Sequence, residues 1–278
     1  MASADWEWDE TLYAGAAAYY VRGRMPYFPE VRDALRDELG LDGTGRLLDL
    51  GCGPGSATLL LADQFAEAVG VDPDAGMLDE AARAARGQGR ANVRWVRRRA
   101  EELPAGLGTF RVAVFAQSFH WMDRARVASV VRGMLEPAGA LVHVGATTDA
   151  GVPGEEPLPA PRPPRDEIAD LVRGFLGARP RAGQGYRPTG TVTGEDEILG
   201  AAGFRGPRRL DVGGGEIVER SEDDVVASVF SLSSAAPHLF GDRQASFEHE
   251  LRQVLRRTSP DGRFCEQRRA VTLSIWRP

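Results

Sequence analysis

The chain has 278 residues, of which 42% are hydrophobic and 27% charged, an ordinary composition for a globular protein of one large domain or two small ones. Its formal net charge of −6 argues against a nucleic-acid partner, and all 34 basic residues are arginine, which excludes a Schiff-base or P-loop lysine. Two cysteines, Cys52 and Cys265, cannot make a disulfide framework, and no apolar run reaches the roughly 18 residues of a membrane span. Because the N-terminus is also acidic and aromatic rather than a signal peptide, we expect a cytoplasmic protein without membrane contact.

The first 30 residues form an aromatic arm. Its rings are Trp6, Trp8, Tyr13, Tyr19, Tyr20, Tyr27 and Phe28. The stretch that follows, 30–40, repeats apolar residues at Val31, Leu35 and Leu39 and ends in Gly40, which predicts an amphipathic helix with a glycine cap.

The middle of the chain alternates short apolar runs with helical patterns. Strands are predicted at 46–50 and 68–72, from Asn92, from Phe110 and at 140–146. Helices are predicted at 57–65, 74–86 and 124–139, the last one stopped by Pro137 and Gly139. Such alternation indicates βαβ units and therefore an α/β protein with a largely parallel sheet.

The pattern changes at 151–165, where proline and glycine predict an exposed connection. Beyond it, helices are predicted over 168–176, 193–202, from Ser221 and over 242–257, with a loop over 177–190. Strands are predicted over 208–212 and, at the end, 269–276.

The most informative motif is the turn that follows the strand at 46–50. Gly51, Gly53 and Gly55 alternate there, and glycine lets a ligand approach the main chain. Asp72 ends the next strand, 17 residues after Gly55, where a carboxylate can accept hydrogen bonds from two ribose hydroxyls.

The glycine spacing discriminates between ligands. The dinucleotide fingerprint GxGxxG would need glycine at position 56, which is Ser56. Asp49, just before the turn, can engage a ligand ammonium directly or through water. A ligand with an amino-acid end and a nucleoside end fits both acids.

Four motifs in order carry a resemblance to a known family. They are DLGCGPG (49–55), GVDPDAGML (70–78), RAEELP (99–104) and FAQSFHW (115–121). With the arm segment AAAYYVRGRMPYFPEV they resemble class I S-adenosylmethionine-dependent methyltransferases, in particular the small-molecule group with the ubiquinone-biosynthesis and trans-aconitate enzymes. The resemblance covers about residues 13–146 and says almost nothing about the substrate.

The resemblance implies a set of cofactor-binding residues. The methionine part of the cofactor would lie along Gly51, Cys52 and Gly53, and Gly55 would complete the turn. The ribose would meet Asp72, and the adenine would lie beside Pro73 and Met77 with its edge at Ala100 and Glu101. The methyl donor would lie near Gln117 and Ser118. Many relatives carry Asp where this chain has Arg99. Since arginine cannot accept a hydrogen bond, the adenine amine must be met by a backbone carbonyl or by Glu101, or Arg99 must stack on the ring.

Residues outside the motifs complete the hypothesis. We expect Arg24 to bind the cofactor carboxylate and Tyr20 to form a wall of its site. His120 is a candidate catalytic base. In the alternative without proton transfer, it only lines the pocket with Trp121. His238 is a second substrate-pocket candidate, or a loop histidine packed on Phe240. His143, inside a strand, reads as a core histidine. No His/Cys cluster has metal-ligand spacing, so no metal is expected.

The predicted fold is a doubly wound, seven-stranded mixed sheet in a single domain over 1–278. The resemblance implies that the last strand inserts antiparallel. The arm over 1–30 is expected to act as a lid, 45–146 to form the cofactor-binding half, and 147–193 and 214–240 to cap the substrate.

The predicted function is methyl transfer from S-adenosyl-L-methionine to an O, N or C nucleophile of a small molecule. Two alternatives stay open: a non-catalytic regulatory protein that binds the cofactor, and a nicotinamide-dependent oxidoreductase. The residues do not indicate an oligomeric state.

Overall fold

A seven-stranded mixed sheet forms the centre of the molecule. The computed structural model describes residues 11–154, 156–177, 181–182, 185–186 and 194–278. The sheet strands are β1 (Arg46–Leu50), β2 (Glu67–Asp72), β3 (Val93–Arg97), β4 (Phe110–Ala116), β5 (Leu135–Gly145), β8 (Arg205–Val212) and β11 (Val271–Arg277). Their order is β3-β2-β1-β4-β5-β11-β8. The first five are mutually parallel and β11 runs antiparallel to both of its neighbours, which confirms the predicted topology.

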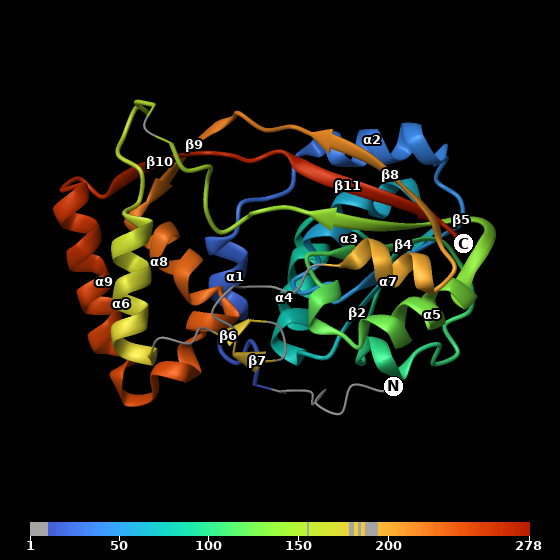
Figure 1. The fold of residues 1–278 in the computed structure, drawn as a ribbon, viewed down its shortest axis with the longest axis horizontal. Coiled ribbons are helices and arrows are strands. Elements are labelled where there is room, and N and C mark those ends of the chain that lie inside the picture. The colour runs from blue at the N-terminus through green and yellow to red at the C-terminus, as the bar shows by residue number, and fades with distance from the viewer. Residues whose placement is uncertain (1–10, 155, 178–180, 183–184, 187–193) are drawn as a thin grey trace.

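Helices cover both faces of this sheet (Figure 1). They are α2 (Pro29–Leu39), α3 (Ser56–Leu61), α4 (Ala75–Gly87), α5 (Arg124–Met134) and α7 (Glu195–Ala201). Strand side chains alternate between the two faces, so Leu48 of β1 packs in the cluster with α5 and α7, while its neighbour Leu47 packs in the cluster with α2 and α3. Both faces are therefore buried, as in a doubly wound fold.

One predicted boundary is wrong. The helix predicted over 124–139 ends at Met134, and β5 begins at Leu135, so Pro137 and Gly139 lie inside the strand. The register against β4 shifts between the pairs Phe110–Leu135 and Val112–Ala140. This irregularity accommodates a proline, which cannot donate to a regular ladder.

A helical lobe stands beside the sheet, and Figure 1 shows it at the end of the molecule opposite β8 and α5. It contains α6 (Arg165–Leu176), α8 (Glu222–Phe230) and α9 (Gln244–Thr258), whose apolar faces share one core around Phe230 and Phe247. The arm helix α1 (Ala17–Gly23) packs on α8 so closely that a Cβ on Gly23 would lie 2.3 Å from the Ala227 backbone. The arm thus belongs structurally to the lobe.

Two strands of the lobe were not predicted, β9 (Ile217–Ser221) and β10 (Arg263–Gln267), which pair antiparallel. Their sequences, IVERS and RFCEQ, lack an apolar alternation because buried positions are charged. Arg220 and Glu266 are each 4% exposed and form an ion pair at 3.2 Å. Glu266 also pairs with Arg165 at 2.8 Å, and Arg220 donates to the carbonyl of Gly23. A charged cluster therefore joins the lobe to the arm.

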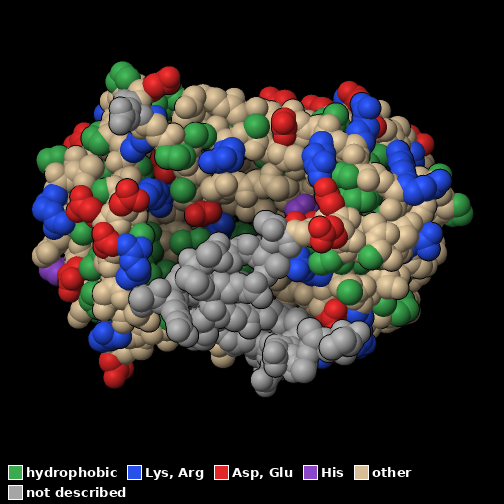
Figure 2. All heavy atoms as spheres, in the orientation of Figure 1, with side chains coloured by type: hydrophobic (Ala, Val, Ile, Leu, Met, Phe, Trp, Pro, Cys, Tyr) green, Lys and Arg blue, Asp and Glu red, His purple; other side chains and the backbone are tan. Residues whose placement is uncertain are grey.

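Most of the predicted loop over 177–190 lies outside the described residues. In its described part, β6 (Arg181–Ala182) pairs with β7 (Gly185–Tyr186). Acidic and basic side chains are interspersed over the described part of the face in Figure 2, in keeping with the many arginine–carboxylate pairs. Within the described part of the chain, no helix is long and apolar enough to cross a membrane.

Candidate active site

A cavity of about 720 Å³ opens where β1, β2 and β4 end. In open parallel sheets, ligands bind outside the carboxyl ends of the strands. The predicted site residues that line it are Tyr20, Gly51, Gly53, Asp72, Pro73, Met77, Ala100, Glu101, Gln117, Ser118 and Trp121. The predicted residues that do not line it are Arg24, Asp49, Cys52, Gly55, His120 and His238.

The glycine turn is held by backbone hydrogen bonds. The N–H groups of Gly51 and Cys52 donate to the carbonyl of Val71 at 2.8 and 3.1 Å. A Cβ on Gly51 would lie 2.6 Å from the Cβ of Ser118, so a side chain is excluded there. A Cβ on Gly53 would meet no atom within 4 Å and would project into open space. The main chain at Gly53 is therefore accessible to a ligand.

Asp72 ends β2 and lies at the wall of the cavity, 8% exposed. One carboxylate oxygen accepts the Gly53 N–H at 2.9 Å, and the other accepts the Asp74 N–H at 2.9 Å. Burial raises the pKa of Asp72 to about 6, although these two backbone donors oppose the shift. The carboxylate is thus fixed in orientation and retains lone pairs for ligand hydroxyls.

Asp49 lies beneath the turn and is fully buried. Thr58 donates to one carboxylate oxygen at 2.6 Å, and the other has no hydrogen-bond partner in the described part of the protein. Burial raises the pKa of Asp49 to about 7. A buried carboxylate oxygen without a hydrogen-bond donor destabilises the protein. The unpartnered oxygen of Asp49 therefore fits the predicted contact with a ligand ammonium. Because Asp49 does not line the cavity, that contact would pass through water.

Trp95 of β3 supports the turn, a role that was not predicted. Its ring lies 2.5 Å from where a Cβ on Gly70 would stand, and 2.6 Å from one on Gly55. Gly55 thus serves this packing instead of lining the cavity. The signal was available, because a glycine inside a buried strand indicates a close approach, and Gly70 and Trp95 are directly paired in the register.

The end of β4 carries a strained residue at the cavity. Gln117 has φ of +57°, a conformation that non-glycine residues rarely adopt and that is frequent at functional sites. Its amide Nε2 donates to the Tyr27 hydroxyl at 3.1 Å. The adjacent Ser118 hydroxyl donates to the carbonyl of Leu50. These contacts fix the β4 end against β1 and the arm.

His120, the predicted base, does not line the cavity, and its ring centroid lies 4.6 Å from that of Trp121. Burial, helped by His143 and Arg124, lowers its pKa to about 4. The imidazole is therefore neutral at about pH 7 and weakly basic. The geometry thus favours neither the base nor the alternative that His120 lines the pocket with Trp121, since only Trp121 lines it. A part of His120 in catalysis stays a prediction.

Arg24 has other partners than the one predicted. Its guanidinium bonds Asp149 at 3.2 Å and the Ser231 hydroxyl at 2.8 Å, and lies 4.7 Å from the centre of the Tyr20 ring. It thereby holds Tyr20 in place between the arm and the lobe. His238 is a second arm contact, because its Nδ1 lies 3.2 Å from the carbonyl oxygen of Ala14.

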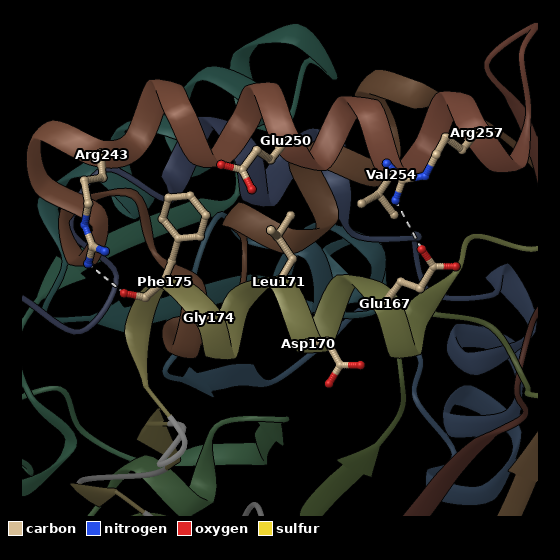
Figure 3. Close-up of a pocket in the computed structure, with 9 residues that line it drawn as sticks. All are labelled: Glu167, Asp170, Leu171, Gly174, Phe175, Arg243, Glu250, Val254 and Arg257. Atoms are coloured by element: carbon tan, nitrogen blue, oxygen red, sulfur yellow. Dashed lines mark hydrogen bonds and ion pairs between the residues drawn. The ribbon is translucent and has the colours of Figure 1, made fainter.

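Another hollow, of about 520 Å³, lies between α6 and α9 on the outside of the lobe (Figure 3). Leu171 and Phe175 point from α6 toward α9, while Asp170 points away. An ion pair of Glu167 and Arg257 at 3.4 Å crosses it. It contains none of the predicted site residues. Among the described side chains, no group of three His, Cys, Asp or Glu could hold a metal ion.

Comparison with known proteins agrees with the fold. Residues 47–139 match the methyltransferase domain family. An uncharacterized methyltransferase of Mycobacterium tuberculosis is 36% identical over 137 residues, which are 49% of this chain and 53% of that protein. Trans-aconitate 2-methyltransferase of Pseudomonas paraeruginosa is 33% identical over 193 residues, 67% of this chain and 57% of that enzyme.

Two solved structures share the fold. One from Anaeromyxobacter dehalogenans, described as a proposed type II methyltransferase, has a TM-score of 0.54 at 21% identity and covers 91% of this chain and 96% of that chain. The YcgJ protein of Bacillus subtilis has a TM-score of 0.51 at 17% identity and covers 90% of this chain and 97% of that chain.

The seven-stranded mixed sheet with helices on both faces is the fold that this chain shares with the methyltransferase structure from Anaeromyxobacter dehalogenans. The match over residues 47–139 makes the comparison specific: this part of the chain is similar to methyltransferase domains, and the predicted resemblance to class I S-adenosylmethionine-dependent methyltransferases is confirmed. The chain spans about half the length of the curated relatives it matches.

Proposed function

We propose that this protein transfers a methyl group from S-adenosylmethionine to an O, N or C nucleophile of a small molecule. The observation that carries the proposal is the cavity at the strand ends, where open main chain at Gly53 adjoins the oriented carboxylate of Asp72. The unpartnered oxygen of Asp49 beneath it supports an amino-acid end for the ligand.

We assign the parts of the cofactor to this chain's residues as follows. Asp72 would accept hydrogen bonds from the ribose hydroxyls, and Asp49 would meet the ammonium through water. Ala100 begins the short helix η2 (Ala100–Glu102) and would contact the adenine edge. One oxygen of Glu101 already accepts the Asp123 N–H at 2.8 Å, which leaves its other oxygen or a backbone carbonyl for the adenine amine. When bound, the cofactor supplies a methyl group activated by its sulfonium.

The remaining residues orient the acceptor and exclude water. The arm lines the cavity with Leu12–Gly15 and Tyr20, and would close over the bound ligands as a lid. The segments 147–193 and 214–240 would cap the acceptor, with α6 and α8 as their described helices, together with α9. Since methyl transfer depends mainly on alignment and exclusion of water, no side-chain base is required, and the acceptor's proton can pass to solvent.

Titration calorimetry with S-adenosylhomocysteine tests the proposal. Asp72→Ala should weaken binding at least about tenfold, because a charged hydrogen bond contributes about 1.5–3 kcal/mol. The matched control is Asp170→Ala, an exposed carboxylate of the lobe, which should bind as the wild type does. Absence of binding by the folded wild type would contradict the proposal, and saturable binding of NADH in its place would favour the oxidoreductase.

A further inference from the structure

The cavity has two chemically different halves. The half at the ends of β2 and β3 carries all of its described charges: Asp72, Asp74, Arg97, Arg98, Arg99, Glu101 and Glu102. The half at the end of β4 is lined by Leu12–Gly15 and Tyr20 of the arm and by Ala116–Ser118, Trp121 and Met122, and none of these described residues is charged. β4 and β2 flank β1 on opposite sides, so the two halves lie over different strands and meet over β1, where the charge of Asp72 acts on Tyr13.

Three aromatic rings, which we call the aromatic corner, stand in the uncharged half. The ring of Tyr13 meets that of Trp121 edge to face at 5.7 Å and 79°, and that of Tyr20 at 6.2 Å and 76°. Burial raises the pKa of Tyr13 far above its usual range, so its phenol stays neutral. Such rings offer large, rigid apolar faces on which another planar ring packs well.

The arginine that stacks on Tyr20 is not available to an anion. Arg24 already has Asp149 and Ser231 as partners, and its guanidinium stacks on Tyr20 instead of lining the cavity. A carboxylate placed in this half would lose its hydration without a described guanidinium to replace it. The half therefore favours an uncharged ligand.

Resting on the proposed function, we infer that the methyl acceptor is an uncharged planar aromatic compound, a phenol or a nitrogen heterocycle, whose ring packs in the aromatic corner. In the reaction, a bond forms between the ring's oxygen or nitrogen and the methyl carbon. The bond from that carbon to the donor sulfur breaks with its electron pair on sulfur. A phenol or an N–H heterocycle then releases its proton to solvent, whereas a ring nitrogen without hydrogen keeps the positive charge as an N-methyl cation. A polycarboxylate acceptor is the competing possibility.

The test measures binding to the protein saturated with S-adenosylhomocysteine. The planar probes are 2-naphthol and quinoline, and the anionic probe is propane-1,2,3-tricarboxylate. We expect at least one planar probe to bind and the tricarboxylate not to compete. Trp121→Leu should weaken the planar probe about tenfold with the affinity for S-adenosylhomocysteine unchanged, and Trp121→Phe, which retains a ring, should restore most of it.

Phe175→Leu is the matched control, since Phe175 lies in the outer hollow of the lobe (Figure 3). It should bind every probe as the wild type does. The inference is overturned if only the tricarboxylate binds, if neither planar probe binds, or if Trp121→Leu and Tyr13→Leu bind the planar probes normally. Loss of S-adenosylhomocysteine affinity in Trp121→Leu would also overturn it, because the rings would then serve the cofactor. Failure of the wild type to bind S-adenosylhomocysteine is the separate result that contradicts the proposed function.

Discussion

The two halves of the cavity are built in different ways. The charged half rests on backbone hydrogen bonds at the ends of adjacent parallel strands, such as those from Gly51 and Cys52 to Val71. The uncharged half depends on the arm, which is held to the lobe by side-chain contacts that bridge about 200 residues of sequence, such as Arg24 to Ser231. The difference suggests that cofactor binding is fixed by the sheet, while acceptor specificity depends on a separate and more easily changed structure.

The largest expected effect is a loss of stability when the contacts that attach the arm to the lobe are removed. Glu266→Ala should lower the free energy of unfolding by about 3–5 kcal/mol, because it leaves Arg165 and Arg220 without their shared buried partner. Denaturant unfolding measures this. The control Glu219→Ala removes an exposed ion pair to Arg263 on the same two strands and should change stability little. Equal losses in both variants would contradict the role of the buried cluster.

A second prediction concerns the packing of Gly70 on Trp95, which supports the charged half. Gly70→Ala would place a Cβ 2.5 Å from the Trp95 ring and 2.9 Å from the Cys52 sulfur, so it should cost about 1–3 kcal/mol of stability and weaken S-adenosylhomocysteine binding. Adding Trp95→Phe should recover part of both losses. Gly87→Ala is the control, since a Cβ there meets no atom within 4 Å. The account of Trp95 is wrong if the second substitution makes both losses worse.

A third prediction uses pH to separate the halves. The pKa values of about 7 for Asp49 and about 6 for Asp72 mean that both are ionised at about pH 8 and become protonated as pH falls. S-adenosylmethionine, which needs the ionised forms, should therefore bind about a hundredfold more weakly at about pH 5.5 than at about pH 8. The affinity for 2-naphthol should change much less, because none of the described residues that line the uncharged half titrates in this range and the probe itself stays neutral. A flat calorimetric profile for S-adenosylmethionine would contradict the assignment.

The stability of the free protein should change in the opposite direction. Both folded pKa values are raised above the usual value of about 3.9 for an aspartate, so the folded state binds protons more tightly than the unfolded chain. The free energy of unfolding should therefore rise as pH falls from about 8 toward about 4, as far as these two groups determine it. Asp49→Asn should flatten the upper part of this rise. An unchanged slope in that variant would remove Asp49 as its source.

The smallest expected effect concerns His120. A general base contributes about 10²–10⁴ to the rate, but a weakly basic imidazole that does not line the cavity contributes little. His120→Gln should therefore keep the wild-type dependence of kcat on pH. A decrease in kcat of about a hundredfold or more, together with a changed dependence of kcat on pH, would show that His120 acts as a general base.

The same comparison explains what could be predicted from sequence. The strands β1 to β4 and the turn at Gly51 are local patterns of five to seven residues, so each could be read without knowing its neighbours. Asp72 was predicted to lie at the site because the carboxyl ends of adjacent parallel strands meet at one edge of the sheet. The prediction that β11 runs antiparallel came from the resemblance alone.

The remainder depended on contacts between distant residues. β9 and β10 were missed because Arg220 and Glu266 are buried as partners of each other, which a search for apolar alternation cannot detect. Arg24 looked available for a ligand carboxylate, since nothing local indicates Asp149 and Ser231 as its partners. His120 follows β4 in sequence, but its ring packs against that of Trp121 and does not line the cavity, which no local pattern indicates.

A crystal structure of the protein with S-adenosylhomocysteine tests most directly the claim that the charged half holds the cofactor. The account predicts ribose hydroxyls within hydrogen-bond distance of the Asp72 carboxylate and the main chain of Gly53 against the ligand. It also predicts that the cofactor does not occupy the aromatic corner of Tyr13, Tyr20 and Trp121. A ligand whose ribose lies away from Asp72, or whose adenine occupies the aromatic corner, would contradict it.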